Sequence, residues 1–158
     1  MSTTKPIPEG FHTLTPHLVC RDAARAIAFY EKAFGAKELG RSLMPDGKSI
    51  MHALLKFGNS HVMLADEFPQ WNSLGPQAIG GSPVTLHLYV EDTDQTYKRA
   101  MDAGAQSKMP PMDMFWGDRY GQVVDPFGHI WAIATHVKDI PPDEIEKAGR
   151  EAMAKGCD

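Results

Sequence analysis

Two histidines at matching positions of a repeated pattern are the first candidates for chemistry. His17 lies in the run Thr15-Pro-His-Leu-Val-Cys-Arg-Asp22, and His87 lies in the run Thr85-Leu-His-Leu-Tyr-Val-Glu-Asp92, 70 residues later (87 − 17 = 70). An imidazole can bind a metal, exchange a proton near neutral pH or orient a ligand. The matching positions predict two equivalent elements that present one imidazole each.

The same offset recurs elsewhere in the chain. Phe57-Gly58 and Phe127-Gly128 are also 70 residues apart, and Gly35-Ala36 and Gly104-Ala105 are 69 residues apart (104 − 35 = 69). Repetition at a nearly fixed offset is typical of a duplicated structural unit. We therefore predict two copies of one small module.

The first module is predicted to span residues 13–67. Alternating apolar residues from Leu14 indicate a strand, Asp22 is a helix N-cap, and Gly35 is the matching C-cap. Three strands are predicted to follow, at Lys37–Met44, Ser49–Phe57 and His61–Asp66. The order is β-α-β-β-β.

The second module is predicted to span residues 84–137 in the same order. Its expected elements are a strand at Val84–Val90, a helix from Asp92 or Thr93 to Gly104, and strands at Gln106–Met114, Arg119–Val124 and His129–His136. Pro110-Pro111 is expected to break the first of these last three strands. The fold class is therefore α+β, with two tandem modules.

The segments outside the modules are assigned from their composition. Residues 1–12 are expected to form a tail, and residues 68–83, which contain Trp71, form either a linker or a lid. Residues 138–158 are expected to form a C-terminal tail with a short helix after Pro141 and a loose end.

Composition excludes several classes of partner. The net charge of −4 without a block of like charges argues against nucleic-acid or anionic-membrane binding. No apolar run reaches the roughly 18 residues of a membrane span, and the N-terminus has no signal-peptide pattern. Cys20 and Cys157 lie too far apart in the chain to suggest a disulfide framework or a metal knuckle. A cytoplasmic protein is expected.

Two motifs add a family resemblance. The run Phe29-Tyr-Glu-Lys-Ala-Phe-Gly-Ala36 and the run Asp125-Pro-Phe-Gly-His-Ile-Trp131, set in paired modules, resemble the vicinal oxygen chelate superfamily. That group includes glyoxalase I, bleomycin-resistance proteins, fosfomycin-resistance enzymes and extradiol dioxygenases. The resemblance implies a curved sheet around a cleft that holds a metal or a small ligand, and a homodimer.

Strand alternation predicts which side chains face the cleft. The leucine-type face of each first strand should pack on the helix, so the opposite face is turned toward the cleft. The residues on that face, including those of the last strand in each module, are Thr15, His17, Val19, His61, Met63, Ala65, Thr85, His87, Tyr89, Ile130, Ala132, Ala134 and His136.

The resemblance also indicates where a metal is usually bound. Its four positions correspond here to Thr15, Met63, Thr85 and Ala132, and none of these offers the imidazole or carboxylate that a divalent metal needs. We therefore expect no metal or other cofactor at these positions. A displaced site built from His17 and His87, together with His61, His136, Asp66 or Glu67, stays open as an alternative.

The aromatic residues bear on the nature of the ligand. Trp71 and Trp116 are either packing residues or parts of a lid that stacks on a flat ligand. Asp118-Arg119 is expected to be a solvated surface pair, and the alternative is a pair that orients a polar ligand. The resulting hypothesis is a protein of the bleomycin-resistance kind, which binds a small organic molecule in a metal-free cleft. The expected ligand-binding residues are His17, His61, Trp71, His87, Tyr89 and Trp116. The alternative is a metal-dependent lyase, isomerase or dioxygenase.

Overall fold

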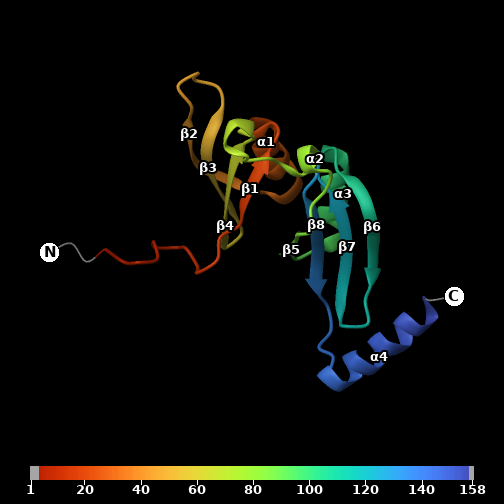
Figure 1. Cartoon of the computed structure of the whole chain (residues 1–158). Helices are drawn as coiled ribbons and strands as arrows, with labels where there is room; N and C mark the ends of the chain where they lie inside the picture. The colour runs from red at the N-terminus through yellow and green to blue at the C-terminus, as the bar shows by residue number, and fades with distance from the viewer. Residues whose placement is uncertain (1–3, 157–158) are drawn as a thin grey trace.

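The computed structural model describes residues 4–156 and contains two modules with the same order of elements (Figure 1). The first comprises β1 (His17–Cys20), α1 (Ala23–Phe34), β2 (Lys37–Leu43), β3 (Ile50–Phe57) and β4 (Ser60–Asp66). The second comprises β5 (Thr85–Tyr89), α3 (Thr93–Ala103), β6 (Gln106–Asp113), β7 (Asp118–Val124) and β8 (Ile130–His136). The sheets have equivalent strand orders, β1-β4-β3-β2 and β5-β8-β7-β6. The predicted α+β fold with two β-α-β-β-β modules is confirmed.

Local capping explains why the two long module helices begin and end where the sequence predicted. The Asp22 side chain accepts a hydrogen bond from the Arg25 backbone N–H, and the Asp92 side chain accepts one from Gln95. At the other ends, Gly35 and Gly104 adopt left-handed backbone conformations that glycine tolerates without steric cost.

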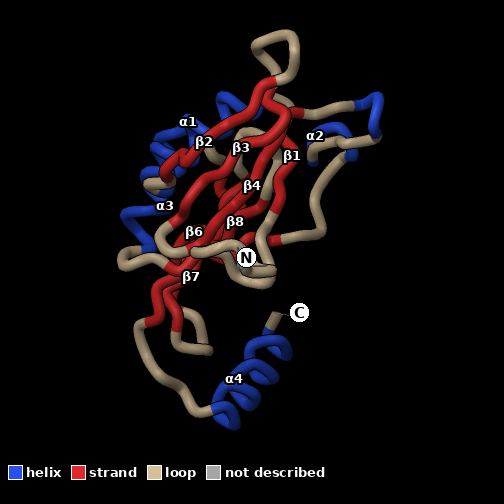
Figure 2. Tube along the Cα trace, turned by 90° about the vertical axis from the view of Figure 1, so that its left-hand side faces the viewer, coloured by secondary structure: helices blue, strands red, loops and turns tan. Residues whose placement is uncertain are grey.

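A shared core joins the two modules. The helices α1 and α3 pack against each other and lie on the same side of the molecule (Figure 2). The buried carboxylate of Asp125, in the second module, accepts hydrogen bonds from the Tyr30 hydroxyl of the first module at 2.6 Å and from Trp131 Nε1 at 2.9 Å. It also accepts the backbone N–H groups of Phe127 and His129. A side chain of α1 and the turn before β8 are thus tied to one carboxylate.

The edge strand β6 differs from the prediction. Pro110-Pro111 does not break it, because β6 runs from Gln106 to Asp113 at the edge of its sheet. The pairing with β7 shifts register between Met109 and Met112. An edge strand tolerates proline at such an irregularity because only one of its sides forms ladder hydrogen bonds.

The connection between the modules contains η1 (Pro69–Trp71) and α2 (Pro76–Ile79), which the sequence did not predict. It is fixed to both modules, since Gly75 N–H donates to Glu67 and the Gln77 amide donates to the Pro126 carbonyl. The C-terminal helix α4 (Pro142–Lys155) has 14 residues and is longer than predicted.

The described part of the chain holds no helix that combines the length and apolar character needed to cross a membrane.

Cys20 is fully buried, and burial raises the pKa of its thiol to about 12. Cys157 lies outside the described residues.

Substitution of Gly117 by alanine is expected to destabilise the fold by about 1–3 kcal/mol. Gly117 has φ +99°, and an added Cβ would collide with the Lys138 carbonyl oxygen, in the segment that leads to α4. Urea unfolding of Gly117→Ala measures the effect. Gly40→Ala is the control, since an added Cβ at Gly40 meets no atom within 4 Å. Equal stability of the two variants would contradict this expectation, because it would show that the backbone around Lys138 moves away from the added Cβ at little cost.

Candidate functional site

The side of the second sheet that faces away from α3 carries most of the polar and aromatic candidates. Leu86, Leu88, Val123 and Ile133 point into the core, so the residues that alternate with them lie on the opposite side. We call this opposite side the second-module face, and it is formed by His87, Tyr89, Trp116, Asp118, Tyr120, Gln122, Ala132, Ala134 and His136.

Two alanines on the central strand form the floor of this face. Ala132 pairs with His87 on one side and Gln122 on the other, and Ala134 pairs with Tyr89 and Tyr120. Both alanines are fully buried although they lie on the side away from the helix. The larger side chains on the flanking strands therefore cover them.

The covering side chains form a continuous aromatic surface. The ring of His87 lies 4.6 Å from that of Tyr89 and 5.8 Å from that of Tyr120, between centroids. Trp116 meets Tyr120 edge to face at 5.4 Å. Tyr89 is 63% exposed, so its ring is available to a ligand. Rings of this kind bind flat organic molecules through large apolar contact areas.

Asp118 organises one end of the second-module face. Its side chain is buried, with the residue 2% exposed, and it accepts hydrogen bonds from the Tyr89 hydroxyl at 3.2 Å and from Trp116 Nε1 at 3.1 Å. His136 Nδ1 lies 2.8 Å from the other carboxylate oxygen. The expectation of a solvated Asp118–Arg119 pair was wrong. Arg119 points to the other side of the sheet and pairs with Asp94 and Asp113.

The same carboxylate affects two titratable neighbours. Partial burial and the Asp118 charge raise the pKa of the Tyr89 hydroxyl, which therefore remains a hydrogen-bond donor. Hydrogen bonds to Asp139 and Asp118 raise the pKa of His136 above its ordinary value. His136 Nε2 lies 2.8 Å from Asp139, so both imidazole nitrogens contact a carboxylate.

The equivalent side of the first sheet carries fewer aromatic and polar candidates. His17 lies beside Met63 on the neighbouring strand, and its ring centroid is 6.1 Å from that of His52. Partial burial and the proximity of His52 lower the pKa of His17, which favours the neutral imidazole. His52 was not among the predicted residues, although it alternates with the core residues Ala53 and Leu55 in a predicted strand and therefore lies on this side.

The six predicted ligand-binding residues do not converge on one point. His87, Tyr89 and Trp116 belong to the second-module face, whereas His17 lies on the first module. His61 stacks on Phe11 at 4.2 Å and, together with His87, lines a pocket between the modules. Trp71 is 62% exposed and contacts Phe68 in the connection. Sequence reasoning also missed Tyr120 and Gln122, which alternate with core residues in β7.

The donor set does not fit a divalent metal at the positions implied by the resemblance. Ala132 is a buried methyl group, and Met63 has His17 as its only imidazole neighbour in the strand pairing. Among residues 4–156, no three His, Cys, Asp or Glu side chains are grouped as a metal ion needs. His17 and His87 belong to different sheets.

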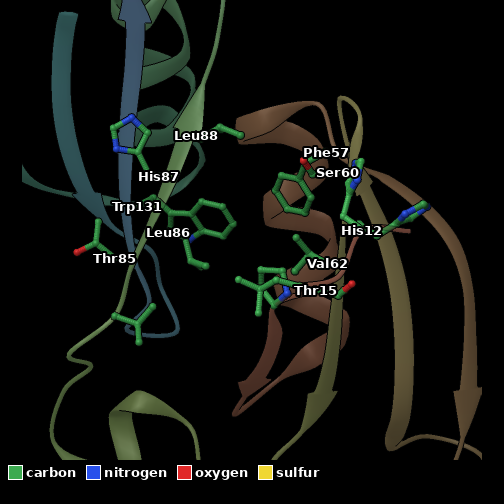
Figure 3. Close-up of a pocket in the computed structure, with 14 residues that line it drawn as sticks. His12, Thr15, Phe57, Ser60, Val62, Thr85, Leu86, His87, Leu88 and Trp131 are labelled. Atoms are coloured by element: carbon green, nitrogen blue, oxygen red, sulfur yellow. The ribbon is translucent and has the colours of Figure 1, made fainter. Parts of the chain in front are cut away.

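A second candidate site, a pocket of about 460 Å³, lies between the modules and shares His87 with the second-module face. Leu86, Leu88 and Trp131 of the second module point across it toward Phe57 and Val62 of the first, and His87 also lines it (Figure 3). We call it the inter-module pocket. Its size suits a small organic ligand. Most of its exposed lining is apolar, although polar side chains such as His12, Ser60 and His61 also line it.

Both the sequence and the structure are similar to those of known proteins. The model of the Glyoxalase/Bleomycin resistance protein/Dioxygenase superfamily matches residues 10–133. An uncharacterized protein of Mycobacterium bovis is 50% identical over 138 residues, which cover 85% of this chain and 90% of that protein.

Solved structures with the same fold include proteins from a bacterium and a plant. TioX from Micromonospora sp. ML1 is 29% identical, with a TM-score of 0.61, over 80% of this chain and 99% of that one. The structure of an Arabidopsis thaliana gene product is 27% identical, with a TM-score of 0.61, over 78% of this chain and 98% of that one.

Proposed function

The chain belongs to the Glyoxalase/Bleomycin resistance protein/Dioxygenase superfamily, and from this premise we propose that it binds a small organic molecule without a metal. The ligand lies against the second-module face, where its flat part contacts Trp116, Tyr89 and His87. Binding proteins and metalloenzymes occur on one fold, so the assignment depends on the site.

One observation carries this proposal. At the centre of the second-module face, where the resemblance implies a metal ligand, stands the methyl group of Ala132, and aromatic rings surround it. A metal needs converging imidazole or carboxylate donors. Aromatic rings around a small-residue floor instead favour contact with an apolar, flat molecule.

The alternative is a metal-dependent enzyme that uses displaced histidines. It would require at least one further donor to join His17 and His52, or at least two to join His87, through a rearrangement or a second copy of the chain. No observation favours it over the binding function, and we derive no catalytic step from it.

Calorimetric titration with indole and 1-naphthol tests the proposal on protein kept in a chelator. We expect saturable binding of at least one probe, lost or weakened in Trp116→Ala and retained in Leu88→Ala. Leu88 lines the inter-module pocket. Loss of binding in Leu88→Ala alone would place the ligand in that pocket, and no binding of either probe would contradict the proposal.

We further propose that the protein is a homodimer. The strands β1 and β5 lie at sheet edges, and each sheet has a second edge at β2 or β6. Exposed edges favour coverage by another chain. Light scattering should give twice the 17.4 kDa of one chain. A monomer mass at all micromolar concentrations would rule this out.

A further inference from the structure

The inference concerns the charge of the ligand and rests on the proposed function of the second-module face. Asp118 is the carboxylate at the end of this face, and three donors surround it: the Tyr89 hydroxyl, the Trp116 indole N–H and His136 Nδ1. A buried carboxylate is strongly unfavourable unless it is paired or hydrogen-bonded. The group that balances the negative charge of Asp118 therefore determines which ligand charge this end of the face accepts.

Among the described residues of β5, β7 and β8, no arginine or lysine shares the side of the sheet on which Asp118 lies. In β5, β7 and β8, the described residues that share its side of the sheet are Thr85, His87, Tyr89, Tyr120, Gln122, Val124, Ile130, Ala132, Ala134 and His136. Arg119 follows Asp118 but pairs with Asp94 across the sheet. His136 is the imidazole of these strands that contacts Asp118, whereas the other histidine of the face, His87, lies against Tyr89 and Tyr120.

His136 is a removable partner. Its side chain is half exposed, at the point where β8 leaves the sheet, and its second contact is to the fully exposed Asp139. Imidazole contacts both carboxylates as a donor only when both nitrogens carry protons. The other charged or titratable groups around it are Tyr89 of β5 and Lys138, whose backbone packs on Gly117.

The neighbouring rings are suited to a cation. Trp116 donates to Asp118 and meets Tyr120 edge to face, and Tyr89 and His87 continue the same surface. Aromatic faces attract ammonium and guanidinium groups through the ring quadrupole, and more strongly where water is partly excluded.

We propose that the second-module face binds an aromatic organic cation whose ammonium or guanidinium group takes the place of protonated His136 beside Asp118. The ligand charge and the proton on His136 then compete for one carboxylate. Binding is consequently stronger at a pH where His136 is neutral than at a pH where it is protonated, and binding releases a proton.

Three probes of similar size and different charge test this inference: phenethylammonium, 2-phenylethanol and 3-phenylpropionate. Calorimetry at pH 8.0 should show the ammonium binding roughly fivefold to thirtyfold more tightly than the alcohol, as expected for a partly desolvated cation on aromatic faces. The carboxylate should bind most weakly. The affinity of the ammonium, but not of the alcohol, should fall at pH 5.5.

Two variants locate the effect. Asp118→Asn should remove the preference for the ammonium, and Asp102→Asn, an exposed acid of α3 that pairs with Lys98, should retain it. His136→Gln should bind the ammonium with no difference between the two pH values, which provides a test even if Asp118→Asn does not fold.

The possible failures are distinct. Equal binding of the alcohol and the ammonium, or a preference that survives Asp118→Asn, would overturn the cation inference while leaving the proposed function intact. Binding of none of the three probes to the wild-type protein would contradict both.

Discussion

Replacement of Asp125 by alanine is expected to lower the free energy of unfolding by about 3–5 kcal/mol, because it removes a buried charge that several donors share. The side chain is 4% exposed and accepts the Tyr30 hydroxyl, the Trp131 indole N–H and two backbone N–H groups. Burial and the Asp125 charge raise the pKa of Tyr30, so its hydroxyl stays protonated and donates. Alanine leaves these donors without an acceptor.

Chemical denaturation monitored by fluorescence and circular dichroism gives the measurement. Asp113→Ala is the matched control, because this carboxylate is largely exposed and contacts Arg119 at 3.4 Å; we expect a change below about 1 kcal/mol. If Asp125→Ala were as stable as Asp113→Ala, the carboxylate would not be what joins α1 to the second module.

Replacement of Trp116 by alanine is expected to weaken binding of 1-naphthol by about 1–3 kcal/mol, which corresponds to roughly fivefold to 150-fold in Kd. The indole ring supplies contact area on the second-module face, and its N–H holds Asp118. Calorimetry at constant pH measures the loss.

Trp71→Ala controls for the removal of an indole as such. Trp71 is exposed in the connection and shares no contact with the second-module face among those described above. We expect the affinity of Trp71→Ala to match the wild-type protein. If the Trp71 variant lost affinity and the Trp116 variant did not, the connection would be the binding element.

The helices and most strands were predictable because their signals are local. Asp22 and Gly35 enclose α1 within the chain segment that they cap, and their roles depend on backbone groups three to five residues away. The alternation around His17 and His87 likewise identified the side of the sheet on which each lies, since side chains in a strand point alternately to its two sides.

The role of Asp118 was not predictable in the same way. Its burial depends on Tyr89, from β5, and on His136, from the end of β8, and these contacts form only when three strands align. In the sequence, a buried Asp that is followed by an Arg cannot be distinguished from a solvated Asp–Arg pair. The contact that distinguishes the two cases, Arg119 with Asp94 of α3, lies on the other side of the sheet.

The connection between the modules and β6 were also not predictable from local sequence patterns. Helix α2 has four residues, too few for a periodic pattern, and it is held by contacts such as that between Gln77 and Pro126. Pro110-Pro111 is a strong local signal against a strand. It was overridden because β6 needs hydrogen bonds only toward β7.

Metal dependence of ligand binding is the most direct test of the metal-free account. Protein purified without a histidine tag is dialysed against zinc, nickel, manganese and iron(II) in turn, analysed for metal, and titrated with 1-naphthol before and after chelation. We expect far less than one metal per chain and the same affinity in both titrations, because Thr15, Met63, Thr85 and Ala132 offer no imidazole or carboxylate. Near-stoichiometric metal that is lost in the His17→Ala, His87→Ala double variant, together with binding that disappears on chelation, would contradict it.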